Sequence, residues 1–108
     1  LVALKNLREL DLSDKQASPE GAKWAGLIPS LRVLRISGGA IKDEGAAHLA
    51  GLPNLEVLLL QGAQLTDAGL EPLAKLKTLR QLDLRGNKLS DAAVAKLQAA
   101  LPAATILR

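Results

Sequence analysis

The chain has 108 residues, of which 48% are hydrophobic, 23% charged and 1% aromatic, and it contains no cysteine. This length and apolar content indicate one folded domain and exclude an intrinsically disordered chain, while the absence of cysteine excludes disulfides and thiolate chemistry. The formal net charge of +3 is spread evenly along the chain, so no basic stripe predicts nucleic-acid binding. Apolar runs are far shorter than the roughly 20 residues that cross a bilayer, so we expect no membrane insertion.

A period of 24 residues organises the whole sequence. Leucine recurs at positions 7, 31, 55 and 79, and in every unit further apolar residues follow three and five positions later. We therefore predict a single repeat array over residues 1–108. Its units are residues 7–30, 31–54, 55–78 and 79–102, with partial units at 1–6 and 103–108. Leu101 comes one residue late in this register, which predicts that the array stops there.

Each unit begins with an apolar alternation of period two, which predicts a short strand with one buried face. The alternating pairs are Leu10 and Leu12, Leu34 and Ile36, Leu58 and Leu60, and Leu82 and Leu84. Two residues after each pair stands a glycine or, in the first unit, an aspartate. These residues are Asp14, Gly38, Gly62 and Gly86. Their types predict a left-handed turn at the end of every strand.

The second half of each unit carries apolar residues three positions apart, which predicts a short helix with one buried stripe. The stripes are Ala22, Ala25 and Ile28; Ala46, Leu49 and Leu52; Leu70, Leu73 and Leu76; and Val94, Leu97 and Ala100. Ser18, Thr66 and Ser90 precede three of these stripes and are expected to cap the helices. In the second unit Lys42 stands at that position, so we expect Asp43 to cap the helix instead.

The third unit differs from the others at Pro72, which lies inside its helical stretch. Proline lacks the amide hydrogen that bonds to the carbonyl four residues earlier. We therefore expect a turn first and a regular helix only from about Glu71.

With these features the units resemble leucine-rich repeats, in which L-x-x-L-x-L is followed by I/L-S/T-D-x-G-L. They are similar to ribonuclease-inhibitor-like, F-box-associated and bacterial repeats. The resemblance implies an α/β solenoid, a right-handed arc of about four repeats with parallel strands on its concave face and short helices on its convex face. One departure concerns the asparagine that is usual eight residues after the first leucine, because it appears only as Asn87. A continuous asparagine ladder is therefore not expected.

Residues that flank the buried leucine pairs are expected to point into the concave face. The candidate partner-binding residues among them are Glu9, Asp11, Val33, Arg35, Val57, Leu59, Gln61, Gln81, Asp83 and Arg85. The centre of this grid, Val33, Val57 and Leu59, is apolar, and charged residues surround it. An apolar centre with a charged rim is typical of a protein-binding patch. The alternative is that valine and leucine stand there because they favour strands.

Trp24 and His48 occupy the same position of successive helices, off the buried stripe. We expect them to be neighbours on the convex side, and tryptophan is enriched in protein interfaces, so they form a second candidate contact. The alternative, which we favour, is that Trp24 is partly buried and covers a first helix whose alanines leave a shallow core. No metal site is expected at His48, because the chain has no second histidine and no cysteine.

No catalytic residue, metal site or cofactor is predicted. The loop at residues 37–40 lacks the lysine of a phosphate-binding loop, and no serine has a histidine base within the repeat geometry. We predict a non-catalytic protein–protein interaction module that binds a protein or peptide on its concave face, as the resemblance implies. The alternative is a structural spacer, or the terminal part of a longer repeat array, with no dedicated ligand. We expect the chain to be a monomer or part of a larger chain.

Overall fold

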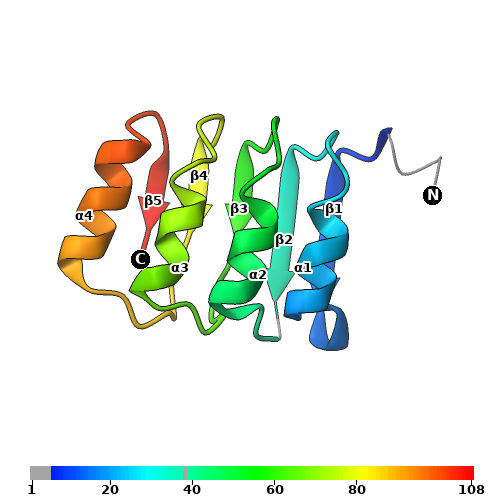
Figure 1. Ribbon diagram of the computed structural model, residues 1–108, viewed down its shortest axis with the longest axis horizontal. Coiled ribbons are helices and arrows are strands. Elements are labelled where there is room, and N and C mark those ends of the chain that lie inside the picture. Colours follow the sequence, from blue (N-terminus) through cyan, green and yellow to red (C-terminus); the bar gives the residue numbers. More distant parts are fainter. Residues whose placement is uncertain (1–5, 38) are drawn as a thin grey trace.

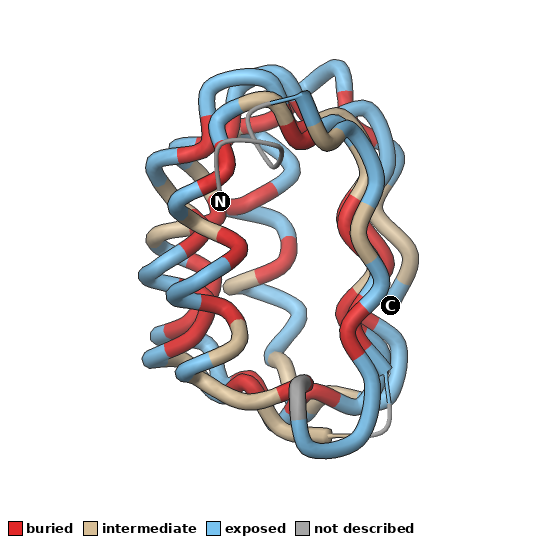
Figure 2. The backbone as a smooth tube through the Cα atoms, turned by 90° about the vertical axis from the view of Figure 1, so that its right-hand side faces the viewer, coloured by how far each residue is buried: buried red, intermediate tan, exposed pale blue. Residues whose placement is uncertain are grey.

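Strands and helices alternate along the chain and form two layers. The computed structural model describes residues 6–37 and 39–108. Its elements are β1 (Glu9–Ser13), the 3-10 helix η2 (Asp14–Gln16), α1 (Pro19–Ala25), β2 (Val33–Ser37), α2 (Lys42–Leu49), β3 (Val57–Leu59), α3 (Asp67–Leu73), β4 (Gln81–Asp83), α4 (Asp91–Ala100) and β5 (Thr105–Leu107). The α-helices lie side by side over one face of the sheet (Figure 1), and the core is enclosed between the two layers (Figure 2). This arrangement confirms the predicted α/β solenoid.

The five strands form one parallel sheet in the order β1-β2-β3-β4-β5. Each residue pairs with the residue 24 positions later, so one row of the sheet consists of Leu10, Leu34, Leu58, Leu82 and Ile106. This register stacks the alternating leucines of neighbouring units on the helix side, where the three central members of the row are fully buried. Repetition in the sequence thus becomes repetition in space, and each unit packs mainly on its neighbours.

The strand β5 shows that the expected stop of the array at Leu101 is wrong. β5 continues the sheet, with Ile106 paired to β4 in the usual register. The one-residue shift is absorbed in two steps. In the preceding unit, Leu79 N donates to Leu76 O in the turn after the helix. The equivalent bond after α4 runs from Ala104 N to Leu101 O, so this turn lies 25 residues later and not 24. The strand then begins one residue sooner after the turn, which restores the spacing of 24.

A single layer of aliphatic side chains fills the space between sheet and helices. The largest fully buried ones are Leu31, Leu34, Ile41, Leu49, Leu55, Leu58, Leu60, Leu65, Leu73, Leu76, Leu79 and Leu82. The predicted helix stripes are buried, except that Ala100 at the end of α4 is half-buried. No helix within the described ranges is long and apolar enough to cross a membrane.

Two of the four α-helices in the described part of the chain begin with the predicted serine caps. Ser18 Oγ accepts a hydrogen bond from Gly21 N, and Ser90 Oγ accepts one from Ala93 N, both at 3.1 Å. Each bond satisfies an amide that the first turn of a helix leaves without a partner. Pro19 follows Ser18 at the start of α1, where the helix needs no amide hydrogen.

The other two helices are not capped as expected. Asp43 lies inside α2 without capping it, and its carboxylate accepts hydrogen bonds from Thr66 N, at 2.8 Å, and from Thr66 Oγ1. Thr66 makes no cap bond to α3, and its hydroxyl donates to Asp43 in this contact. Asp67 binds Ser90 in the same way, at 2.9 Å to the amide and 2.8 Å to the hydroxyl. These aspartates therefore link the start of one helix to the start of the next.

The helix α3 begins at Asp67 and not at Glu71, so the delay expected from Pro72 is wrong. Pro72 is near the end of this seven-residue helix and removes only one hydrogen bond, the one to the carbonyl of Ala68. Ala68 is exposed, so water can satisfy its carbonyl.

Left-handed turns follow three of the strands, as predicted. The φ angle is +51° at Asp14, +58° at Gly62 and +80° at Gly86. Gly38, for which the same turn is predicted, lies outside the described residues, as do residues 1–5 of the first partial unit. Asn87, which follows Gly86, forms one rung between units, because its Nδ2 donates to two backbone carbonyls at 2.8 and 2.9 Å.

Candidate functional site

The concave sheet face is the side of the sheet that points away from the helices (Figure 2). Strand pairing arranges its residues in rows: one holds Glu9, Val33, Val57, Gln81 and Thr105, and the next holds Asp11, Arg35, Leu59, Asp83 and Leu107. Gln61 and Arg85 follow shortly after β3 and β4. The ten residues singled out in the sequence therefore lie together on this face, with neighbours in a row about 4.8 Å apart.

The middle of the face is apolar. Val33, Val57 and Leu59 are half-buried and reach the surface there, and we call these three residues the apolar strip. Leu107 of β5 is also half-buried and pairs with Asp83, so it extends the apolar surface beyond that residue. Leu107 is not among the residues predicted from the sequence, because the repeat register slips before it. The signal that identifies it is its place 24 residues after Asp83.

On the β1 side of the apolar strip, two carboxylates share one guanidinium group. Arg35 Nη1 lies 3.2 Å from Asp11 Oδ1 and 3.5 Å from Glu9 Oε1. The hydrogen bond to Asp11 is the main reason why the pKa of Arg35 is raised. Both carboxylates remain in contact with solvent, since the side chains of Glu9 and Asp11 are 64% and 69% exposed.

On the β4 side, a buried carboxylate is held by several donors. Asp83 is only 3% exposed, and it is the one buried charged residue in the described part of the chain. It accepts hydrogen bonds from Arg85 Nε at 3.0 Å, Arg85 Nη2 at 2.8 Å, Arg85 N at 3.1 Å and Gln61 Nε2 at 2.9 Å. The side-chain hydrogen bond from Arg85 is the largest cause of the lowered pKa of Asp83.

This burial corrects the expectation that Asp83 is an open contact on the charged rim. Arg85 lies two residues further along, on the same side of the sheet, and folds back over the carboxylate. Gln61 from the preceding unit covers it from the other side. Asp83 therefore positions Arg85 and Gln61, and these two exposed residues are the ones that face solvent.

A hollow of about 510 Å³ lies on this face between the two charged clusters. Its lining includes Asp11 and Arg35 from the β1 side, Leu59 from the apolar strip, and Arg85 and Leu107 from the β4 side. Such a space can take an apolar side chain of another molecule, while the charged groups at both ends fix its orientation.

The convex side carries exposed apolar side chains at the first helix. Trp24 is 61% exposed and Leu27 is 65% exposed, so the favoured interpretation of Trp24 as a partly buried cover is wrong. Ala22 and Ala25 are fully buried while the indole lies mostly in solvent, so the alanine stripe of α1 does not depend on Trp24 for cover. His48 is exposed as well, and the described residues hold no cluster of three potential metal-binding side chains.

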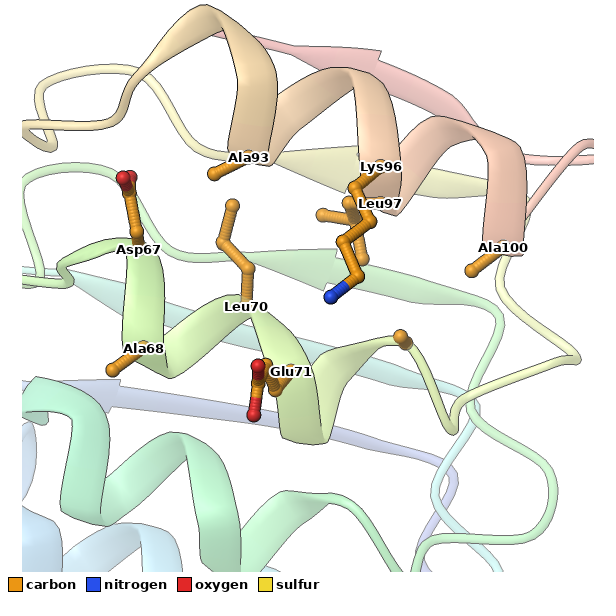
Figure 3. Close-up of a pocket in the computed structure, with 9 residues that line it drawn as sticks. Asp67, Ala68, Leu70, Glu71, Ala93, Lys96, Leu97 and Ala100 are labelled. Carbon is orange, nitrogen blue, oxygen red and sulfur yellow. The ribbon is translucent and has the colours of Figure 1, made fainter.

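A second hollow, of about 300 Å³, lies between α3 and α4 (Figure 3). Leu70 and Leu97 line it together with small side chains such as Ala93, and Glu71 and Lys96 stand on opposite helices. The repeat pattern does not predict this hollow, because the hollow depends on the distance between two helices.

Comparisons with known proteins agree with this architecture. The family described as "Leucine rich repeat" matches residues 29–89. No curated protein matches the sequence. Among solved structures, the fold is similar to that of the protein in "Crystal structure of TLR13-ssRNA13 complex", with 21% sequence identity and a TM-score of 0.53. That likeness covers 95% of this chain but only 19% of the other one. Because the family match spans more than half of the sequence, the chain belongs to the leucine-rich repeat family.

Proposed function

We propose that this chain binds a protein or peptide segment on its concave sheet face. The observation that carries the proposal is the apolar strip, which stands at the surface between two ion-paired clusters and beside a hollow of about 510 Å³. An apolar centre with a polar rim is the usual anatomy of a protein-binding surface. Complete burial of an exposed valine or leucine side chain contributes about 1.5–3 kcal/mol, and each of these three half-buried side chains can supply part of that amount to a partner.

Family membership supports the same proposal, because leucine-rich repeats generally act as protein–protein interaction modules and are generally not catalytic. The structure similar to this one contains single-stranded RNA according to its title. The described part of this sheet face has no aromatic side chain for base stacking, and its three acidic residues outnumber its two arginines. A protein segment is therefore the partner that the chemistry of this face favours.

The test uses a displayed peptide library selected on the wild-type chain, followed by measurement of Kd for the selected peptides. Leu59→Asp places a charge in the apolar strip and is expected to weaken binding by about tenfold or more. The substitution removes the apolar contact of Leu59 with the partner, and the new carboxylate must lose its hydration when the partner binds. Val57→Lys is expected to act in the same direction.

The matched control is Ala92→Asp, which adds the same charge on the exposed first turn of α4, on the opposite side of the molecule. It is expected to leave Kd unchanged. Unchanged affinity in a folded Leu59→Asp/Val57→Lys variant would rule out the concave site. A library that yields no peptide sensitive to these changes would favour the alternative of a structural spacer or part of a longer array without a ligand.

A further inference from the structure

The charges of the concave sheet face are not balanced from one side to the other. Among the described residues, Asp83 on the β4 side accepts four hydrogen bonds, from the backbone and side chain of Arg85 and from Gln61. A carboxylate has about four lone-pair sites, so Asp83 has no acceptor capacity left for a partner. The charge of Asp83 is neutralised by Arg85, whose Nη2 lies 2.8 Å from Asp83 Oδ2.

The β1 side is different, because two carboxylates there face one cation. Arg35 reaches both acids through the same nitrogen, Nη1. Among the described residues, no other cationic side chain forms an ion pair with Glu9 or Asp11. One oxygen of each carboxylate, Glu9 Oε2 and Asp11 Oδ2, accepts no hydrogen bond from the described part of the chain. The open acceptors and the excess negative charge of the face therefore lie together at Glu9 and Asp11.

We propose that the segment bound on this face carries a basic side chain, lysine or arginine, about three residues from the apolar side chain that it places on Leu59. This inference rests on the proposed function and specifies the partner. Asp11 and Leu59 belong to one row and are separated by two strand spacings, about 10 Å. A peptide in the polyproline II conformation advances about 3.1 Å per residue and completes one turn in three residues, so side chains three residues apart lie on the same face and about 9 Å from each other.

The arrangement assigns different roles to the two ends of the face. The apolar strip supplies the area that is buried, and the pair Glu9 and Asp11 selects the charge of the neighbouring residue. Long-range attraction of a basic segment to these acids also favours its correct direction across the sheet. An acidic residue at the same place would meet two carboxylates and be rejected.

The experiment compares two synthetic peptide pools that share a central leucine and differ three residues to either side of it, with lysine in one pool and glutamate in the other. Kd is measured by fluorescence anisotropy at low and at high salt. The lysine pool is expected to bind about tenfold more tightly at low salt, because Glu9 and Asp11 attract lysine and repel glutamate. The preference is expected to shrink at high salt.

The variant Glu9→Gln/Asp11→Asn keeps the shapes of both side chains and removes their charges. It is expected to reduce the preference for lysine to less than about twofold. Glu20→Gln, which removes one exposed charge from α1 on the helix side, is the control and is expected to keep the preference.

Two results overturn the proposal in distinguishable ways. If Leu59→Asp abolishes binding of both pools while the charge-free variant keeps the full preference for lysine, the basic residue is not recognised by Glu9 and Asp11, and the concave site stands. If neither pool binds the wild-type chain better than it binds Leu59→Asp, the concave site itself is refuted.

Discussion

Two neighbouring helix contacts are built from the same sequence motif but pack differently. At the contact of α2 with α3, Asp43 binds the amide of Thr66 at 2.8 Å, and at the contact of α3 with α4, Asp67 binds the amide of Ser90 at 2.9 Å. The hydroxyls of Thr66 and Ser90 donate to the second oxygen in both cases. The hydrogen-bonded link between helix starts is thus the same.

The difference lies in one methyl group. A Cβ atom at Gly69 would overlap Asp43 Oδ1, so the missing side chain leaves room for the carboxylate and for a close helix contact. The corresponding residue of α4 is Ala93, and its side chain lines the open hollow between α3 and α4 (Figure 3). Hydrogen bonds thus fix where the helices start, while side-chain size sets how closely the helices pack.

The largest expected effect compares two leucines of the helix stripes. Leu73→Ala is expected to cost about 2–5 kcal/mol of unfolding free energy, because Leu73 is fully buried and its removal leaves a closed cavity. Leu97→Ala is expected to stay near the lower end, about 2 kcal/mol, since the space that it leaves opens into the existing hollow. Urea unfolding of both variants measures the difference. Equal costs would show that the hollow does not loosen the contact of α3 with α4.

The next effect concerns Gly69→Ala. Alanine favours a helix by about 1 kcal/mol over glycine, but here its methyl displaces the Asp43 carboxylate, and we expect a net loss of about 1–3 kcal/mol. In an Asp43→Ala background the carboxylate is gone and the remaining close neighbour of the added methyl is the end of the Leu65 side chain, at 3.2 Å, so the same substitution is expected to cost much less. Thermal or urea unfolding of the four proteins in this cycle gives the coupling energy.

The reverse change, Ala93→Gly, serves as the control at the contact of α3 with α4, which we call the open contact because it contains the hollow; the contact of α2 with α3 is the closed contact. This control substitution is expected to cost only the difference in helix propensity, about 1 kcal/mol. If Gly69→Ala had the same effect with and without Asp43, the absence of a side chain at residue 69 would not serve to make room for the Asp43 carboxylate.

The repeat pattern predicted the fold and the rows of the concave face, because a fixed period forces equivalent residues into register. It could not predict features that depend on how individual side chains meet. The burial of Asp83 arises from the way Arg85 folds back over it, which residue order alone does not determine. Leu107 was missed because the late position of Leu101 hides the compensating shift before β5, although Leu107 stands 24 residues after Asp83. The exposure of Trp24 likewise depends on three-dimensional packing, since Ala22 and Ala25 are fully buried although the indole lies mostly in solvent.

The smallest expected effect tests the aspartate link across the open contact by its dependence on pH. The amide of Ser90 donates to the carboxylate of Asp67, its hydroxyl donates as well, and these bonds lower the pKa of Asp67. The pKa in the folded state is therefore below that in the unfolded chain, about 3.9. The contribution of this link to stability is complete above the unfolded value and is lost as the pH falls through the folded one.

An NMR titration of the Ser90 amide follows this protonation directly. Because the carboxylate accepts from that amide, the resonance is expected to shift with a midpoint below about 3.9, and Asp67→Asn is expected to remove the shift. A midpoint at or above that value would mean that the carboxylate gains nothing from Ser90. The contact of α3 with α4 would then lack the link that it shares with the closed contact, and its greater openness would follow from the missing bonds and not from the methyl group of Ala93.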